Sequence, residues 1–285
     1  MRFETSPELR LFADSVRGAL GSWEPPREPV FGSWWDEHDT GLAERVAAVG
    51  WGELWAAPEL LGAAVTGGIE LGRVLAPLSL LDTATLGGAL AVDGRARHLA
   101  FQEHKVALVT RQGLVLRVAE PGQREPTLDG AGTVRIAAVS DTAVSDTAAR
   151  LRAWGSATLG YLAGVAAASL EETVAYVSSR EQFGKSLASL PTMQARLADA
   201  ALAVDGLELV AWESAVAVPG DANAEADPLP REALRFGGAA AREVTASAQQ
   251  AHGGIGFALE SGVHRAYRRA KSAQVWITAV LDVAP

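Results

Sequence analysis

Apolar side chains recur at helical spacing along most of the chain, which predicts a mainly α-helical protein. The segment Ser6-Pro7-Glu8 has the order of a helix start: a capping side chain, a proline that needs no donor, and an acid in the first turn. Helices are therefore predicted over 7–20, 39–49 and 63–75. Together they predict an N-terminal helical domain over residues 1–97.

The pattern changes to short apolar runs between residues 98 and 147. The runs contain Val106, Leu108, Leu114, Leu116, Val118, Val134, Ile136 and Val139. The dipeptides Gln112-Gly113, Pro121-Gly122 and Asp129-Gly130 have turn chemistry and separate the runs. We therefore predict a small β module over 98–147, which buries too little apolar area to be stable unless it packs against the helices.

From residue 148 onward, helical spacing resumes, and Pro191 has the position of a first helical residue. An acidic, proline-containing linker is predicted over 219–230. Helices are predicted over 151–180, 191–218, 231–251 and 261–280. Four helices joined in this way predict an antiparallel four-helix bundle as a C-terminal domain over 148–285.

Composition excludes several classes of protein. The 285 residues include no cysteine, which rules out disulfides, thiolate metal sites and a thiol nucleophile. A net charge of −9 without a basic stripe argues against nucleic-acid binding. Acids interrupt the first twenty residues, and no apolar run reaches membrane-spanning length. We expect a cytoplasmic protein, and the hydrophobic content of 48% favours an oligomer.

Two short motifs about seventy residues apart carry the candidate chemistry. The first is Arg180-Glu181-Gln182-Phe183-Gly184, and the second is Gln250-Ala251-His252-Gly253-Gly254-Ile255-Gly256. Taken singly, each has an ordinary explanation, as a helix C-terminal cation with a packed aromatic residue or as a glycine helix stop. Taken together, they offer a guanidinium for a diphosphate, an aromatic face for adenine, an amide and bare backbone. The glycines do not have the spacing of a dinucleotide-binding fingerprint.

With these motifs the chain resembles the acyl-CoA dehydrogenase family. The segments 57–59 and 70–77 are similar to its N-terminal helical domain, and residues 148–278 to its C-terminal four-helix domain. The resemblance implies an acyl-CoA dehydrogenase-like fold with a reduced middle β module. It also implies that the ADP part of an FAD shared with a partner subunit is held by Arg180, Gln182, Phe183, Gln250, Gly253 and Gly254.

Two departures from the family concern catalysis. Residues 98–147 contain no segment similar to the Trp-x-Thr/Ser strand that holds the flavin ring in the family. Ile277 stands where many members carry the catalytic glutamate, and the other position used for this base falls near Trp154. Removal of an α-proton requires a base, which neither residue supplies. We therefore expect no catalytic residue and no metal ligand in this chain, and we interpret His252 as a structural hydrogen-bonding residue.

The resemblance then implies a reduced, non-catalytic subunit of a heteromeric FAD-dependent acyl-CoA dehydrogenase. Its partner is a larger catalytic subunit in an α2β2 assembly, and the substrate of the complex is an acyl-CoA such as a steroid side-chain CoA. Two alternatives stay open. In the first, the fold serves flavin-independent chemistry such as dehydration or cyclisation, with His252 or an N-terminal acid as the acting group. In the second, the chain is a purely structural partner. For Trp34, Trp35, Trp51 and Trp55 we expect core or interface packing.

Overall fold

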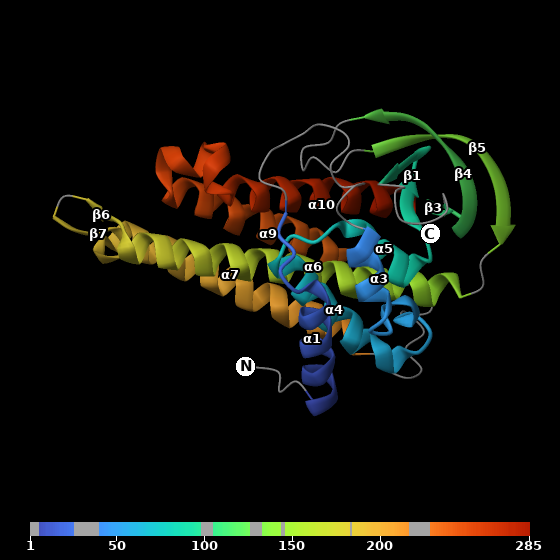
Figure 1. Ribbon diagram of the computed structural model, residues 1–285, viewed down its shortest axis with the longest axis horizontal. Helices are drawn as coiled ribbons and strands as arrows, with labels where there is room; N and C mark the ends of the chain where they lie inside the picture. Colours follow the sequence, from blue (N-terminus) through green and yellow to red (C-terminus); the bar gives the residue numbers. More distant parts are fainter. Residues whose placement is uncertain are drawn as a thin grey trace.

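Helices make up most of the molecule, and a small barrel of strands lies at one end of them (Figure 1). The computed structural model describes residues 6–25, 40–97, 105–125, 133–143, 146–182, 184–216 and 229–285. The α-helices are α1 (Pro7–Leu20), α3 (Thr40–Ala47), α4 (Leu61–Arg73), α5 (Leu78–Leu86), α6 (Thr147–Ser179), α7 (Pro191–Ala215), α9 (Arg231–Ala251) and α10 (Val263–Val283). The strands are β1 (Ala89–Val92), β2 (Arg95–Arg97), β3 (Lys105–Thr110), β4 (Gly113–Glu125), β5 (Thr133–Ala143), β6 (Glu181–Gln182) and β7 (Lys185–Ser186). Short 3₁₀ turns are η1 (Trp51–Glu53), η2 (Pro58–Leu60), η3 (Leu187–Ser189), η4 (Gly253–Phe257) and η5 (Leu259–Ser261).

The N-terminal helices follow the predicted pattern with one exception. Helix α1 begins at Pro7, and the hydroxyl of Ser6 accepts a hydrogen bond from the backbone N–H of Leu9 at 3.3 Å, which satisfies one free donor of the first turn. Helix α5 was not predicted. Nearly all of its residues are buried, so it has no polar face and no amphipathic period for a sequence pattern to reveal.

The C-terminal four-helix bundle is confirmed. Helix α9 has the predicted bounds, whereas α6 begins at Thr147 rather than 151, α7 ends at Ala215 rather than 218, and α10 is displaced toward the C-terminus. Helix α6 packs against α7, α9 and α10, and α7 and α10 both pack against α9. The predicted acidic linker lies almost entirely at 217–228, outside the described residues. No helix in the described ranges combines the length and apolar character needed to cross a bilayer.

The β module folds as a closed barrel with strand order β1-β2-β5-β4-β3. Strands β1 and β3 close it in parallel, with Ala89 opposite Val106, and the other pairs are antiparallel. The sheet therefore begins at Ala89, within the region predicted to be helical. A small apolar core fills the barrel and consists of Ala89, Ala91, Ala96, Val106 and Val134.

The predicted turn at Pro121-Gly122 is wrong, because both residues lie inside strand β4. The pairing of β4 with β5 shifts register on either side of Pro121, which stands opposite Ile136. A proline cannot donate to a neighbouring strand, and an irregularity of this kind accommodates the missing donor. The turn before Gly113 is confirmed, since β3 and β4 form a hairpin there. The predicted turn at Asp129-Gly130 lies outside the described residues.

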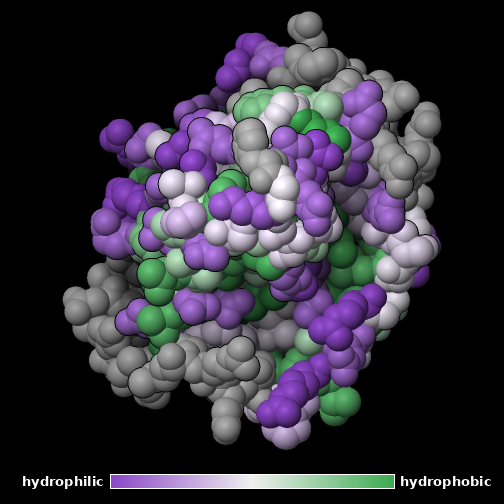
Figure 2. All heavy atoms as spheres, turned by 90° about the vertical axis from the view of Figure 1, so that its left-hand side faces the viewer, coloured by the Kyte–Doolittle hydropathy of each residue, from purple (hydrophilic) through white to green (hydrophobic). Residues whose placement is uncertain are grey.

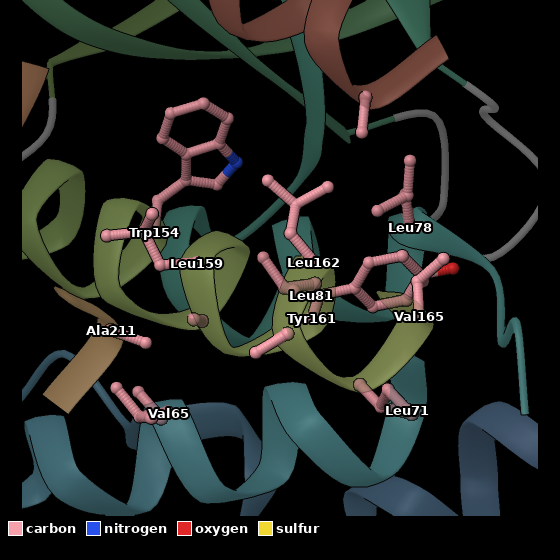
Figure 3. Packing of buried hydrophobic residues seen from close by; sticks show 14 of the residues in the cluster. Val65, Leu71, Leu78, Leu81, Trp154, Leu159, Tyr161, Leu162, Val165 and Ala211 are labelled. Carbon is pink, nitrogen blue, oxygen red and sulfur yellow. The ribbon is translucent and has the colours of Figure 1, made fainter. Parts of the chain in front are cut away.

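Glycines bring α4 and α6 into backbone contact. Gly68 and Gly72 of α4 face Gly160 and Gly164 of α6, with the same four-residue spacing on both helices. A Cβ atom on Gly72 would lie 2.0 Å from the carbonyl oxygen of Tyr161, and one on Gly164 would lie 2.1 Å from that of Ile69. Larger side chains pack on both sides of this seam (Figure 3), among them Val65, Leu71, Tyr161, Leu162 and Val165.

A buried ion pair joins the barrel to the helices. Asp82 of α5 is fully buried and Arg97 of β2 is 4% exposed. Arg97 donates Nε to Oδ2 of Asp82 at 2.9 Å and Nη2 to its Oδ1. The backbone N–H of Leu90 and the indole Nε1 of Trp154 also donate to the carboxylate, each at 3.2 Å. One carboxylate therefore links α5, β1, β2 and α6.

Replacement of Gly72 by alanine tests the seam. The new Cβ has no room beside the Tyr161 carbonyl, so α4 and α6 must separate, and we expect Gly72→Ala to lower the free energy of unfolding by about 1–3 kcal/mol. Chemical denaturation measures the change. Gly18 of α1 is the matched control, because a Cβ there meets no atom within 4 Å, and Gly18→Ala should raise stability by about 0.5–1 kcal/mol. Equal effects of both substitutions would contradict the seam.

Replacement of Asp82 tests the ion pair. We expect Asp82→Ala to lower the free energy of unfolding by about 3–5 kcal/mol, because Arg97 is left as an uncompensated buried charge. The double variant Asp82→Leu with Arg97→Met should recover part of the loss, since it buries no charge. As control, Glu232→Ala removes the exposed pair with Arg235 and should cost about 0–1 kcal/mol. A small effect of Asp82→Ala in the same denaturation assay would show that the pair is dispensable.

Candidate functional site

The first motif begins where helix α6 ends. Arg180 leaves the helix with an extended backbone, its N–H donating to the carbonyl of Tyr176 and its own carbonyl accepting from Leu187, both at 2.9 Å. Strands β6 and β7 follow as a two-stranded hairpin, and Gly184 at its tip has a φ of +77°, a backbone conformation that favours glycine. The side chains of Arg180 and Gln182 are exposed. Phe183 lies outside the described residues.

The second motif closes helix α9 and forms the turn η4. Gln250 is exposed in the last turn of α9, and Gly253 follows with a φ of +63°. At Gly256 a Cβ would lie 2.3 Å from the carbonyl oxygen of Gln249, so this glycine is needed for the turn to fold back on the helix. Gly254 differs from both, since its φ is not positive and a Cβ there would meet no atom within 4 Å. Within the described residues, neither backbone conformation nor crowding requires a glycine at position 254.

Two contacts join the second motif to the helices that precede and follow the first. The ring of Tyr176, near the end of α6, stacks on the ring of His252 with centroids 4.2 Å apart and planes inclined by 20°. Arg196 of α7 donates Nη1 to Oε1 of Gln250 at 2.6 Å. The ends of α6 and α9 and the start of α7 therefore meet at one end of the bundle, far from the barrel (Figure 1). Figure 2 looks onto this end, where hydrophilic and hydrophobic side chains are mixed.

Arg196 was missed by sequence reasoning. It lies within a helix, outside both motifs, and only the packing of α7 against α9 brings it to Gln250. The role expected for His252 agrees with its surroundings, because the side chain is 6% exposed, its Nδ1 lies 2.8 Å from the carbonyl oxygen of Ala248, and its ring is covered by Tyr176. A base must reach a substrate proton, and His252 is enclosed by its own chain.

The chemistry available at this end is anion binding. Arg180, Lys185 and Arg196 supply three cationic groups, with Glu181 as an acid among them. Guanidinium groups form paired, charge-assisted hydrogen bonds with phosphate oxygens, an amide adds further donors, and glycine allows close approach to the backbone. Among the described residues, no three His, Asp or Glu side chains are grouped so as to hold a metal ion.

The two positions at which members of the family carry the catalytic base lie elsewhere, in the packed core of this chain. Trp154 is 1% exposed and Ile277 is 2% exposed. The indole of Trp154 donates to Asp82, and the Arg97 guanidinium lies 5.6 Å from the ring centroid of Trp276. Asp82 is the carboxylate at this place, but it accepts from Arg97, Trp154 and the Leu90 N–H and is fully buried. Its lone pairs are engaged within the protein, so it has no access to a substrate proton.

Of the four tryptophans for which core or interface packing is expected, Trp51 lies in the core and Trp55 is half-buried against a neighbouring side chain. Trp51 is 2% exposed, donates Nε1 to the carbonyl of Leu80 at 2.7 Å and stacks on Phe12 with ring centroids 6.4 Å apart. Trp55 packs under the guanidinium of Arg150, which lies 3.6 Å from its ring centroid. Burial lowers the pKa of Arg150 from its ordinary value. Trp34 and Trp35 lie outside the described residues.

Comparison with known proteins places this geometry in context. Residues 153–277 match the family model described as acyl-CoA dehydrogenase, C-terminal domain. The mitochondrial short-chain specific acyl-CoA dehydrogenase of Rattus norvegicus is 33% identical over 116 residues, which is 40% of this chain and 27% of the rat protein. The chain thus spans about a quarter of the length of that relative.

Two solved structures are similar along nearly the whole chain. The ChsE4-ChsE5 complex from Mycobacterium tuberculosis matches with a TM-score of 0.72 and 16% identity, over 99% of this chain and 96% of the other. A variant of the Tcur3481-Tcur3483 steroid ACAD matches with a TM-score of 0.68 and 19% identity, over 96% of each chain. The chain therefore has the acyl-CoA dehydrogenase fold, and its residues 153–277 are similar to the C-terminal domain of that family.

Proposed function

We propose that the chain is the reduced, non-catalytic subunit of a heteromeric FAD-dependent acyl-CoA dehydrogenase. In this proposal a larger catalytic subunit performs α,β-desaturation of an acyl-CoA, and the two chains form an α2β2 assembly in the cytoplasm. Residues 1–97 and 148–285 are its N-terminal and C-terminal helical domains, and residues 98–147 are a reduced middle β module. Arg180, Gln182, Phe183, Gln250, Gly253 and Gly254 contact the ADP part of an FAD shared with the partner.

The observation that carries the proposal is the packing at the two positions where the family places its base. Trp154 and Ile277 are buried side chains of the core, and neither accepts a proton. The surroundings of Trp154 are equally closed, since Asp82 accepts from both Trp154 and Arg97, and the Arg97 guanidinium lies over the ring of Trp276. An enzyme of this class needs a carboxylate that reaches the α-carbon of the acyl group. The chain therefore depends on a partner for catalysis.

A second observation supports the role at the other end of the bundle. In the part of the chain that the structure describes, the glycine at Gly254 is explained neither by backbone conformation nor by crowding. A group outside the chain that approaches the backbone closely would account for it. FAD supplies the hydride acceptor when it is bound. This chain's own contribution is to neutralise and hydrogen-bond the diphosphate through Arg180 and Gln250 and to leave the backbone uncovered at Gly253 and Gly254.

The similar structures support the heteromeric form of the proposal. One of them is a complex of two named chains, and the other is named as a steroid ACAD. Identities of 16% and 19% show the fold alone, and a fold does not fix a function. The substrate we propose is a steroid side-chain CoA. A subunit that binds no acyl group of its own leaves room for a bulky acyl group bound at the partner's site.

Co-expression with a larger, catalytic acyl-CoA dehydrogenase subunit tests the proposal. The complex should be yellow, with flavin bound in proportion to the catalytic subunit, whereas the chain purified alone should be colourless. Flavin absorbance, analytical ultracentrifugation and dehydrogenase activity of both preparations measure this. Stoichiometric flavin in the isolated chain, or desaturation by the chain alone, would contradict the proposal. Dehydration or cyclisation by the chain alone, lost in His252→Ala, would favour a reassigned enzyme, and flavin content insensitive to Arg180→Ala and Gln250→Ala would favour a purely structural partner.

Replacement of Gly254 separates a ligand contact from a structural requirement. Because a Cβ at this position meets open space, Gly254→Ala should leave the isolated chain as stable as before or about 0.4–1 kcal/mol more stable. In the complex, the same methyl group should lower flavin content. Thermal unfolding of the chain and the flavin-to-protein absorbance ratio of the complex provide the two measurements. Gly18→Ala is the matched control for both, and normal flavin content in the Gly254→Ala complex would exclude the proposed contact.

A further inference from the structure

Arg196 and Gln250 form a contact that neither motif predicts. Arg196 lies in the second turn of α7, and Gln250 lies in the last turn of α9, 54 residues later in the chain. The Nη1 atom of Arg196 donates to Oε1 of Gln250 at 2.6 Å. This is the length of a strong, charge-assisted hydrogen bond. The glutamine side chain is exposed, whereas Arg196 is half-buried.

The contact fixes which way the glutamine amide faces. A glutamine amide has an accepting oxygen and a nitrogen with two donor hydrogens, while a guanidinium only donates. Arg196 can therefore bind only the oxygen of Gln250, and the two N–H groups of the amide must face away from the arginine. With the oxygen engaged, the group that Gln250 offers to any ligand is a pair of hydrogen-bond donors.

Both the backbone and the side chain of Gln250 are held. The stack of Tyr176 on His252 fixes the end of α9 against the end of α6, two residues beyond Gln250. An exposed glutamine otherwise has freely rotating side-chain bonds, and ordering it on ligand binding costs conformational entropy. The hydrogen bond from Arg196 provides this order in advance, and the positive charge behind the amide strengthens its N–H groups as donors to an anion.

We infer that Arg196 is a positioning residue, which orients Gln250 so that both amide N–H groups are available to the diphosphate of FAD. The inference rests on the proposed function, because it takes FAD as the ligand of this end of the bundle. Arg196 acts through Gln250 in this account and makes no contact with the cofactor itself. A direct contact between Arg196 and the diphosphate is the competing arrangement, and the two differ in how substitutions combine.

A double-mutant cycle on the complex tests the inference. The co-expressed complex is purified as wild type, Arg196→Ala, Gln250→Ala and the double variant, its flavin is removed, and FAD is titrated back while flavin fluorescence is followed. We expect Arg196→Ala and Gln250→Ala each to raise the dissociation constant of FAD about tenfold. The double variant should also show an increase of about tenfold rather than a hundredfold, because Arg196 has nothing to orient once Gln250 is gone.

Two further variants serve as controls. Arg196→Lys keeps a cationic donor and should recover most of the affinity, which a loss caused by misfolding would not do. Arg235→Ala removes the same charge from an exposed position of α9, several turns away from Gln250, and should leave the dissociation constant unchanged. Thermal unfolding of each isolated chain confirms that the variants fold.

The outcomes separate this inference from the proposed function. If Gln250→Ala weakens FAD binding and Arg196→Ala does not, Arg196 has no positioning role and the proposed function stands. If the two effects multiply to about a hundredfold, Arg196 acts independently and the inference is wrong. If neither Arg180→Ala nor Gln250→Ala changes FAD affinity, the cofactor role of this end of the bundle fails, and the inference fails with it.

Discussion

The backbone contact between α4 and α6 is the constraint on which the rest of the structure depends. Helix α6 has 33 residues and reaches from the barrel to the hairpin that carries Arg180. Its N-terminal half is buried on nearly all sides, and the four glycines of the seam are what allow a second helix to lie directly on its carbonyls. Because a long helix is stiff, its attachment to α4 in one half also fixes the direction in which its other end projects. The N-terminal domain thereby helps to set the place of the candidate site at the far end of α6.

At the opposite end of α6, a buried aromatic side chain and a buried ion pair stabilise each other. Trp154 lies on α6 close to the barrel, and its indole N–H needs an acceptor when buried. Asp82 provides the acceptor, and a buried carboxylate in turn needs a counter-charge, which Arg97 supplies from the barrel. The large aromatic side chain and the ion pair thus depend on each other. Together they join the barrel to the bundle.

Sequence patterns predicted the elements with local signals and missed those that depend on distant contacts. Ser6 and Pro7 set the start of α1, and Pro191 sets that of α7, because capping and proline chemistry act within a single turn. Helix α5 has no amphipathic period, so its own sequence does not reveal it. Strand β1 is held by parallel pairing with β3, which the residues around β1 do not indicate. Pro121 has turn chemistry, yet pairing with β5 keeps it within a strand. Arg196 likewise acquires its contact with Gln250 only when α7 packs on α9.

The glycines can be divided into those that backbone packing or conformation requires and one, Gly254, that neither requires. Gly72 and Gly160 are required because a Cβ would collide with the backbone of the facing helix, and Gly256 is required because its turn folds onto Gln249. Gly253 is required by its left-handed backbone. Gly254 meets none of these conditions, although it stands in the same turn. A glycine with no internal reason among the described residues, four positions after a glutamine that an arginine holds, is consistent with the proposal that this turn faces an anionic ligand.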